Sequence, residues 1–256
     1  MMADRFAGHS ALITGAASGI GLATAGRLVQ EGVARLVLCD IDGGALARAS
    51  AQVARDGLII DTLTGDVADP LFWDKAQPML KGVTLGVANA GIADGGPIDS
   101  MDFAAWRRVM AINLDGVFLT LQALFQALEG PGAIVVTASV VGIKAEVGTA
   151  AYAASKAGAL HLMRVAAKEG APRAIRVNAI APGGVRTAIW DQAPFFVDLA
   201  KRRGGTDAAF AAMGEATPLG RFASADETAA QIAFLLSDDA AMMTGSVLVS
   251  DGGYQL

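Results

Sequence analysis

Short apolar runs rich in β-branched residues alternate along the chain with longer stretches in which apolar side chains recur every three or four positions. Short runs without polar alternation indicate buried strands, and the longer period indicates helices that pack by one face. The expected strands are Ser10–Thr14, Arg35–Cys39, Leu58–Leu63, Thr84–Ala88, Ala133–Ala138, Ile175–Ile180 and Ser246–Val249. The expected helices are Gly19–Glu31, Gly43–Arg55, Pro70–Leu80, Asp102–Leu128, Ala151–Gly170 and Asp226–Ser237.

This alternation predicts a single α/β domain over residues 1–256, with a doubly wound, seven-stranded parallel sheet and helices on both faces. Such sheets bind their ligands beyond the carboxyl ends of the strands. Candidate chemistry is therefore expected in the segments that directly follow strands.

Residues 188–217 interrupt the alternation between the sixth strand and the last helix. They combine charges and glycines with large apolar side chains, namely Trp190, Phe195, Phe196, Phe210 and Met213. Connections of this length are usually functional, so a substrate-binding lid is expected here. A pair of ordinary surface helices with apolar undersides is the alternative.

Composition narrows the classes of function. Hydrophobic residues make up 53% of the chain and charged residues 18%, which excludes disorder. The net charge of -5 argues against nucleic acid and anionic membranes as partners. The uncharged stretch 6–26 is interrupted by glycines and hydroxyl residues, so neither a signal peptide nor a membrane span is expected. With Cys39 alone and only two histidines, neither a disulfide nor a metal cluster is expected, and a cytoplasmic location fits.

A glycine-rich turn follows the first expected strand and opens the first helix, over Thr14–Gly21. Gly15, Gly19 and Gly21 allow a tight turn and close approach of the backbone to a pyrophosphate at a helix N-terminus. The turn lacks the lysine of phosphate-loop NTPases.

An acidic residue, Asp40, ends the second strand nineteen residues after Gly21. A carboxylate there accepts hydrogen bonds from ribose hydroxyls and repels a 2′-phosphate, which favours NAD over NADP. A helix cap or turn residue before Gly43 is the alternative role for Asp40.

Tyr152 and Lys156 lie four residues apart in an expected helix, on one helix face. The ammonium favours the phenolate, so we expect the pKa of Tyr152 to fall toward neutrality and its side chain to act as a general acid and base. By itself the pair is a weak motif. Ser139 ends the fifth expected strand thirteen residues before Tyr152.

Taken in order, these motifs resemble the compact branch of the short-chain dehydrogenase/reductase family along the whole chain. The resemblance is carried by the glycine turn Thr14–Gly21, Asp66-Val67, Asn89-Ala90-Gly91, Asn113, Ser139, the Tyr152/Lys156 pair, the loop Pro182–Thr187 and the ending Val249–Gly253. Two departures are present. Ala88 stands where the family usually has a first Asn, and the stretch 69–85 is short, so its helix should be short too.

The resemblance implies a Rossmann-type NAD(P)-binding domain that transfers hydride between a secondary alcohol and a nicotinamide. Tyr152 would be the general base or acid and Ser139 would stabilise charge on the substrate oxygen. Lys156 would lower the pKa of Tyr152 and bind ribose, while Asn113 would hold a water of a proton relay. The implied cofactor contacts are Gly15, Ser18, Gly19, Ile20, Gly21, Asp40, Ile41, Asp66, Val67, Asn89, Ala90, Gly91, Tyr152, Lys156, Pro182, Gly183, Val185 and Thr187.

The expected substrate pocket lies between the residues after Ser139 and the segment 188–217. Its implied substrate contacts are Ser139, Val141, Val147, Tyr152, Ile189 and Trp190, with Ile92, Ala93, Phe195 and Phe196 as further candidate walls. These mostly apolar side chains favour a hydrophobic or cyclic secondary alcohol or its ketone. Asp94 and Glu146 are either contacts for a second hydroxyl or solvated loop acids.

Two other functions stay open. A 3-oxoacyl-ACP or acyl-CoA reductase fits the same motifs, with the basic trio Lys201–Arg203 as a docking face, although Asp40 and the apolar lid count against it. A catalytically silent nucleotide-binding scaffold would keep the fold, but the intact catalytic set speaks against it. Helices Asp102–Leu128 and Ala151–Gly170 are more apolar than one buried face requires, so we expect a homotetramer.

Overall fold

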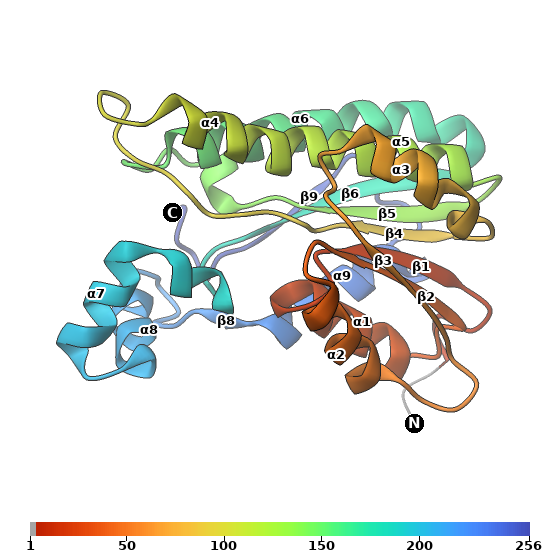
Figure 1. Ribbon diagram of the computed structural model, residues 1–256, viewed down its shortest axis with the longest axis horizontal. Helices are drawn as coiled ribbons and strands as arrows, with labels where there is room; N and C mark the ends of the chain where they lie inside the picture. The colour runs from red at the N-terminus through yellow and green to blue at the C-terminus, as the bar shows by residue number, and fades with distance from the viewer. Residues whose placement is uncertain (1–3) are drawn as a thin grey trace.

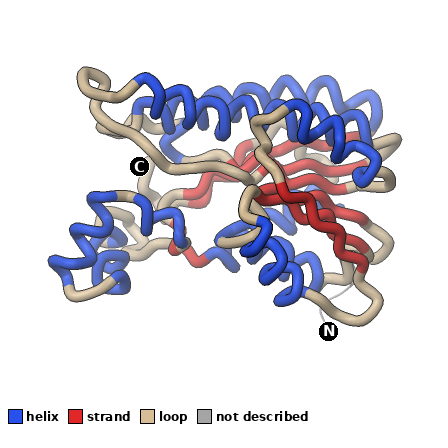
Figure 2. The backbone as a smooth tube through the Cα atoms, viewed as in Figure 1, coloured by secondary structure: helices blue, strands red, loops and turns tan. Residues whose placement is uncertain are grey.

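A computed structural model describes residues 4–256. Its centre is a parallel sheet of seven strands in the order β3-β2-β1-β4-β5-β6-β9, between two layers of helices (Figures 1 and 2). The doubly wound fold expected from the sequence is confirmed. The strands are β1 (Ser10–Thr14), β2 (Arg35–Asp40), β3 (Ile59–Thr64), β4 (Leu85–Ala88), β5 (Gly132–Thr137), β6 (Ile175–Pro182) and β9 (Val247–Ser250). Their ends differ from the expected ones by one or two residues.

Alternate side chains of each central strand enter two separate cores. Leu12 of β1 belongs to the core that α3 (Pro70–Ala76), α5 (Gly116–Ala127) and α6 (Ala150–Gly170) cover. Ile13 belongs to the core beneath α1 (Gly19–Gln30), α2 (Gly43–Val53) and α9 (Ala225–Leu236). Because both faces are covered, the strands are apolar without alternation, as in other parallel sheets. The helix α3 has only seven residues, in line with the short segment that precedes β4.

The prediction of a single helix over Asp102–Leu128 is wrong in one respect. It consists of α4 (Phe103–Met110), one π-helical turn (Ala111–Asp115) and α5. The wider turn places Asn113 in the interior, where its side chain bonds the main chain of Ile92 in both directions, at 2.8 and 2.9 Å. Such π turns recur at functional sites. Hydrophobic periodicity did not reveal it, since the long-range amide contact that accompanies it is not a local signal.

Arginine side chains hold helix ends against the sheet. Arg176 of β6 donates to the carbonyls of Leu235, Leu236 and Ser237 at the end of α9, at 2.8–3.0 Å. Arg173 likewise donates to the carbonyl of Leu128 at the end of α5, at 3.1 Å. A cation at a helix C-terminus satisfies unpaired carbonyls and opposes the helix dipole. Burial lowers the pKa of Arg176, while the charge of Asp238 opposes that shift.

The segment 188–217, which we call the lid, forms a 3-10 turn (Ala188–Gln192), α7 (Pro194–Arg203) and α8 (Thr206–Gly214). It stands beyond the carboxyl ends of the strands, apart from the main body (Figure 1). Its apolar side chains pack mainly on one another, around Phe196, which is 1% exposed. Two short parallel strands join it to the body, β7 (Val185–Arg186) before it and β8 (Ala223–Ser224) after it.

The helical stretch Phe103–Ala127 has the length and the mean hydropathy, 1.3, of a segment that could cross a membrane. Half of its apolar window is buried inside the fold, where α5 packs on β4 and α6. Core helices of globular proteins meet the same criterion. The stretch by itself is therefore weak evidence of a membrane span.

Candidate active site

The glycine turn between β1 and α1 leaves no room for side chains on its inner surface. Gly15 and Gly19 have left-handed backbones, with φ of 65° and 53°. A Cβ on Gly21 would lie 2.1 Å from the carbonyl oxygen of Gly15. The N-terminus of α1 therefore presents bare backbone, because Ser18, the residue before the helix, does not cap it with its side chain. A cradle of this kind fits the pyrophosphate of a dinucleotide.

Asn89 holds this turn against the end of β4. Its side-chain amide donates to the carbonyl of Thr14 at 3.0 Å and to that of Gly15 at 3.4 Å. The main-chain N–H groups of Asn89 and Ala90 donate to the hydroxyl of Thr14 at 3.0 and 3.1 Å. One asparagine thus supports the turn, which explains why Ala88 can replace the other. Thr14 was not among the residues singled out by the sequence, since its role depends on a neighbouring strand.

Asp40 lies at the end of β2, beside the turn. Its carboxylate accepts the N–H of Ala17 at 3.0 Å and that of Asp42 at 3.1 Å. Asp42, not Asp40, caps α2 by accepting the N–H of Ala45 at 2.9 Å. The alternative role of Asp40 as a helix cap is therefore wrong, whereas its role as a turn residue is present as well, because it accepts the N–H two residues further on. The carboxylate is half-buried, and Ile41 next to it is 69% exposed, as a residue that covers a bound group would be.

The other expected cofactor contacts follow neighbouring strands. Asp66 accepts the N–H of Ala68 at 2.9 Å, and buried Val67 packs against Gly116 of α5. Pro182 ends β6, and Gly183 approaches the backbone of Asp251 so closely that a Cβ would lie 2.8 Å from its Cα. Val185 is buried in β7, and half-buried Ile20 opens α1. The methyl group of Thr187 lies 3.3 Å from where a Cβ of Gly19 would be, so the loop after β6 meets the glycine turn.

Ser139, Tyr152 and Lys156 meet beyond the end of β5. Lys156 is 3% exposed, and its ammonium donates to the main-chain carbonyl of Thr137 at 2.9 Å. The ammonium lies 5.7 Å from the centre of the Tyr152 ring. It forms no ion pair among the described residues. A Cβ on Gly91 would lie 3.3 Å from it, so only glycine leaves its remaining donors open.

The pKa of Tyr152 departs from the expectation drawn from the sequence. Burial raises the pKa of the phenol above its usual value of 10.0, and the hydrogen bond with Ser139 opposes that shift. Burial also lowers the pKa of Lys156 to about 8. The expected fall of the Tyr152 pKa toward neutrality is thus wrong for the protein alone, since desolvation outweighs the hydrogen bond with Ser139.

Asn113 is fully buried, and its amide is already engaged. Besides the two bonds to Ile92, its side-chain N–H₂ donates to the hydroxyl of Ser155 at 3.2 Å. Its carbonyl oxygen lies 3.1 Å from where a Cβ of Gly91 would be. The side chain therefore fixes the Gly91 loop beside Lys156.

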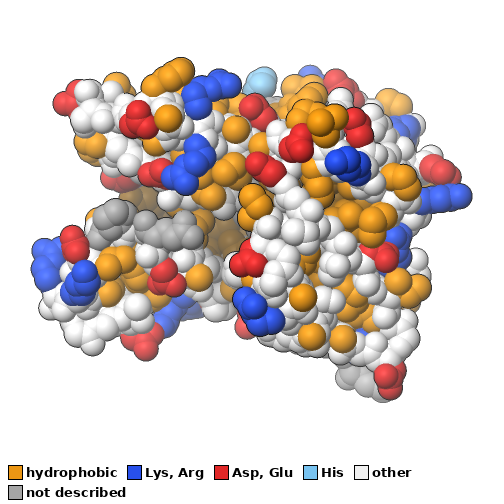
Figure 3. Space-filling model, in the orientation of Figure 1, with side chains coloured by type: hydrophobic (Ala, Val, Ile, Leu, Met, Phe, Trp, Pro, Cys, Tyr) orange, Lys and Arg blue, Asp and Glu red, His pale blue; other side chains and the backbone are white. Residues whose placement is uncertain are grey.

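Beyond this cluster the surface is hollowed between the lid and the layer of α4, with hydrophobic side chains on its floor (Figure 3). Val141 and Ile189 are half-buried, whereas Val147 is 93% exposed. Trp190 donates to the carbonyl of Val185 at 2.8 Å and packs on three phenylalanine rings of the lid region, those of Phe195, Phe196 and Phe222. It is thus largely a core residue of the lid.

The two acids that were expected to be either substrate contacts or solvated loop residues each bond another side chain. Asp94 pairs with Arg108 at 2.6 Å, and Glu146 accepts the hydroxyl of Tyr254. Among the described residues no group of three metal-binding side chains occurs.

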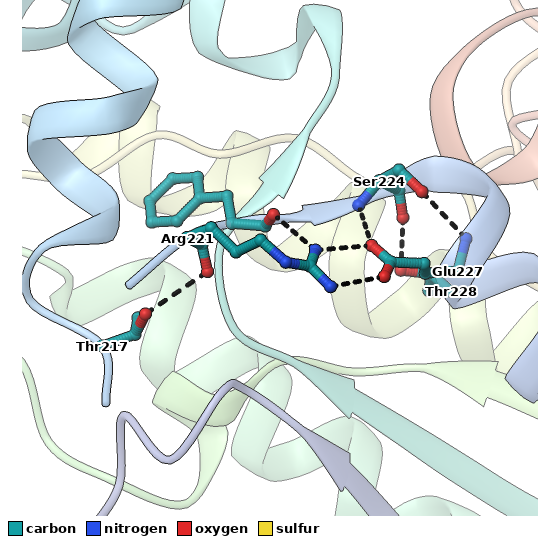
Figure 4. Close-up of polar contacts among 6 residues, drawn as sticks. Thr217, Arg221, Ser224, Glu227 and Thr228 are labelled. Atoms are coloured by element: carbon teal, nitrogen blue, oxygen red, sulfur yellow. Dashed lines mark hydrogen bonds and ion pairs between the residues drawn. The ribbon is translucent and has the colours of Figure 1, made fainter. Parts of the chain in front are cut away.

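A polar cluster that the sequence analysis missed fixes the point where the lid rejoins the body (Figure 4). Arg221 donates to both carboxylate oxygens of Glu227, at 2.6 and 2.8 Å. The same carboxylate accepts the N–H of Ser224, whose hydroxyl accepts the N–H of Glu227 in return. These two bonds form a capping box, Ser224-x-x-Glu227, whose spacing in the sequence is a sign of a helix start. The helix accordingly begins one residue before Asp226, the start that we expected.

A doubly wound sheet with a glycine cradle at its switch point and a Ser-Tyr-Lys cluster beside it defines a nucleotide-dependent oxidoreductase. Residues 15–255 match the family model described as "Enoyl-(Acyl carrier protein) reductase". The chain belongs to the short-chain dehydrogenase/reductase family, as the motifs indicated, and its members use nicotinamide cofactors to act on CH–OH groups.

Named relatives align over almost the whole chain. The cis-4-hydroxycyclohexanecarboxylate dehydrogenase of Sinomonas cyclohexanicum is 39% identical over 99% of both chains. The cyclohexanol dehydrogenase of an Acinetobacter species is 33% identical over 99% of this chain and 98% of its own. The crystal structure of levodione reductase superimposes with a TM-score of 0.89 at 35% identity, covering 98% of this chain and 99% of that one.

Gly21→Ala should weaken nucleotide binding about five- to a hundredfold, because its methyl group would lie 2.1 Å from the carbonyl oxygen of Gly15. Displacing backbone in a packed turn costs about 1–3 kcal/mol. Gly26→Ala, further along α1 with no atom within 4 Å of its added Cβ, is the matched control. NADH fluorescence titration would measure both affinities, and a Gly21→Ala variant that binds like Gly26→Ala would contradict the assigned cradle.

Proposed function

We propose that this protein is an NAD-dependent oxidoreductase that interconverts a hydrophobic or cyclic secondary alcohol and its ketone. The observation that carries the proposal is the buried ammonium of Lys156 beside Tyr152 and Ser139, at the edge of a hollow with an apolar floor. The names of the relatives support the cyclic-alcohol part of the proposal, since one names 4-hydroxycyclohexanecarboxylate and another names cyclohexanol as substrate.

The residues present fit a dinucleotide. The bare glycine turn fits its pyrophosphate, and Asp40, with a carboxylate oriented by two N–H groups, fits the hydroxyls of the adenosine ribose. The half-buried carboxylate would repel the 2′-phosphate of NADP, which is why we propose NAD. When bound, NAD supplies the acceptor for the hydride of the carbinol carbon.

In alcohol oxidation Tyr152 takes the hydroxyl proton of the substrate at its phenolate oxygen. Ser139, which is 8% exposed, holds the same substrate oxygen and stabilises charge that develops on it. Lys156 favours the phenolate and donates to ribose hydroxyls with the N–H groups that Thr137 leaves open. A positive ring bound beside Tyr152 favours the phenolate further and opposes the effect of burial. Asn113 positions the π turn, which we propose relays the proton to solvent.

The assigned substrate contacts are Ser139 and Tyr152 at the reacting oxygen, with Val141, Val147, Ile189 and Trp190 as walls closed by the lid, residues 188–217. Because Asp94 and Glu146 bond Arg108 and Tyr254, the pocket offers few polar partners. This favours a hydrophobic ring over a polyol.

A 3-oxoacyl-thioester reductase is the second candidate. The exposed trio Lys201–Arg203 at the end of α7 offers a basic face to an acidic carrier, and the matching family model carries an acyl-carrier description. The carboxylate of Asp40 counts against it, since such reductases usually take NADPH.

For the assembly we propose a homotetramer in the cytoplasm. The outer faces of the helices carry exposed apolar side chains, including Phe103 at 71%, Phe118 at 47% and Val165 at 42%. Such a patch usually marks an interface. A second contact through β9 would complete dihedral symmetry.

Tyr152→Phe should reduce NADH formation from a panel of cyclic and acyclic secondary alcohols by about a hundred- to ten-thousandfold, because only the proton-transferring oxygen is lost. NADH affinity should stay nearly unchanged, whereas Lys156→Met should damage both turnover and affinity. Because burial raises the pKa of Tyr152 above its usual value of 10.0, wild-type oxidation should accelerate as pH rises above neutrality, and ketone reduction should slow only at a pH above that value. Substantial turnover by Tyr152→Phe would exclude the mechanism.

Asp40→Ala should weaken NAD binding about ten- to a hundredfold and improve NADP relative to NAD, because a charged hydrogen bond and a repulsive charge are lost together. Asp42→Ala, which removes only the cap of α2, should leave the preference between the two nucleotides unchanged. Steady-state kinetics with both nucleotides test this. A wild-type protein that prefers NADPH would favour the thioester reductase instead.

Light scattering at micromolar concentration should give about four times the chain mass of 26.0 kDa. A mass equal to that of one chain would exclude the proposed assembly.

A further inference from the structure

The loop 143–149 connects the two halves of the catalytic cluster. It follows the 3-10 turn after Ser139 and ends where α6 begins, just before Tyr152. On one side it touches the loop after β4, since a Cβ on Gly95 would lie 2.5 Å from the carbonyl oxygen of Gly148. It carries Val147, one of the expected substrate contacts, and follows directly on the turn that carries Val141.

The C-terminal tail holds the same loop from the other side. The ammonium of Lys144 donates to the main-chain carbonyl of Tyr254 at 2.8 Å and lies 4.0 Å from the centre of its ring. The hydroxyl of Tyr254 donates to the carboxylate of Glu146. Tyr254 therefore makes three contacts with one short loop, through its ring, its hydroxyl and its carbonyl. The bond to Glu146 raises the pKa of Tyr254 to about 12, so its hydroxyl remains a donor at neutral pH.

The same tail also holds the exit of the lid. The N–H of Leu219 donates to the carbonyl of Gly252 at 3.1 Å. A Cβ on Gly253 would lie 2.8 Å from the ring of Pro218, so the two chains are in direct contact. Asp251 fixes the turn of the tail by accepting the N–H groups of Gly253 and Gln255, both at 2.9 Å. In Figure 1 the C-terminus lies between the lid and the layer of α4 and α6.

We propose that Tyr254 is a positioning residue that couples the lid to the loop 143–149 and thereby sets the size of alcohol that the site accepts. Tyr254 acts on the pocket through the loop and does not touch the reacting atoms. The size preference rests on the proposed alcohol oxidation, whereas the coupling rests on the contacts of Tyr254 with the loop and on those of the adjacent Gly252 and Gly253 with the lid exit. Neither Asp94 nor the glycine turn that forms the cofactor cradle takes part in the contacts of Tyr254. The affinity for the nucleotide should therefore be independent of Tyr254.

Hydrogen exchange tests the coupling without any substrate. Tyr254→Ala should speed amide exchange both in the loop 143–149 and at the lid exit 217–222. Tyr254→Phe should affect the loop alone, because it keeps the ring and the main-chain contacts and loses only the bond to Glu146. Leu256→Ala, at a fully exposed side chain of the same tail, is the matched control and should change neither segment. Unchanged exchange at the lid exit in Tyr254→Ala would overturn the coupling.

Kinetics test the size preference. For Tyr254→Ala the ratio of kcat/KM for cyclohexanol to that for 4-tert-butylcyclohexanol should fall about three- to tenfold, the equivalent of one hydrogen bond. The change should lie mainly in KM, with the pH profile of oxidation and the NADH affinity unaltered. An equal loss on both alcohols, a loss of NADH affinity or an unchanged ratio would each overturn the size-setting role. If wild-type protein oxidised no alcohol, the proposed function would fail, and hydrogen exchange would still decide the coupling.

Discussion

The buried, unpaired ammonium of Lys156 is the constraint around which the site is arranged. An ion in a protein interior loses solvation worth several kcal/mol, and among the described residues the carbonyl of Thr137 and the ring of Tyr152 replace it in part. The lowered pKa of about 8 is the direct sign of that cost. The fold keeps the ammonium in place because it sits on a long, well-packed helix, and because Gly91 and the bonded amide of Asn113 leave its remaining donors uncovered. Ligand hydroxyls in that space would relieve the lost solvation, so the strain favours nucleotide binding.

Much of the architecture follows from local signals. Seven short, mostly apolar runs, separated by stretches of helical period, identified the parallel sheet, and the glycine spacing in Thr14–Gly21 identified the turn after β1. The motifs that directly follow strands could also be identified from the sequence, because parallel strands present their carboxyl ends at one edge of the sheet, where ligands bind. The features that the local sequence pattern did not reveal depend on contacts between residues that are distant in sequence. The π turn accompanies a bond between Asn113 and Ile92, and Thr14 matters only because β4 lies beside β1.

The behaviour of Tyr152 shows the same limit in electrostatic terms. Helical spacing correctly brought an ammonium near the phenol, but spacing carries no information about how much water each group loses. The structure makes desolvation the larger effect on both groups. Trp190 is a related case. Its position in the chain suggested a pocket wall, but the pattern of apolar residues did not reveal that it also packs on the aromatic rings of the lid.

The parallel pairing of β7 with β8 has an evolutionary consequence. The chain leaves the body at Arg186 and returns at Ala223 on an adjacent strand, and adjacent strands lie about 5 Å apart. A segment whose two ends are neighbours can be lengthened, shortened or exchanged without moving the sheet that carries it. The segment between β7 and β8, with its own aromatic core, is therefore a natural unit for recombination among relatives. New substrate ranges can arise there while the hydride-transfer machinery is inherited intact.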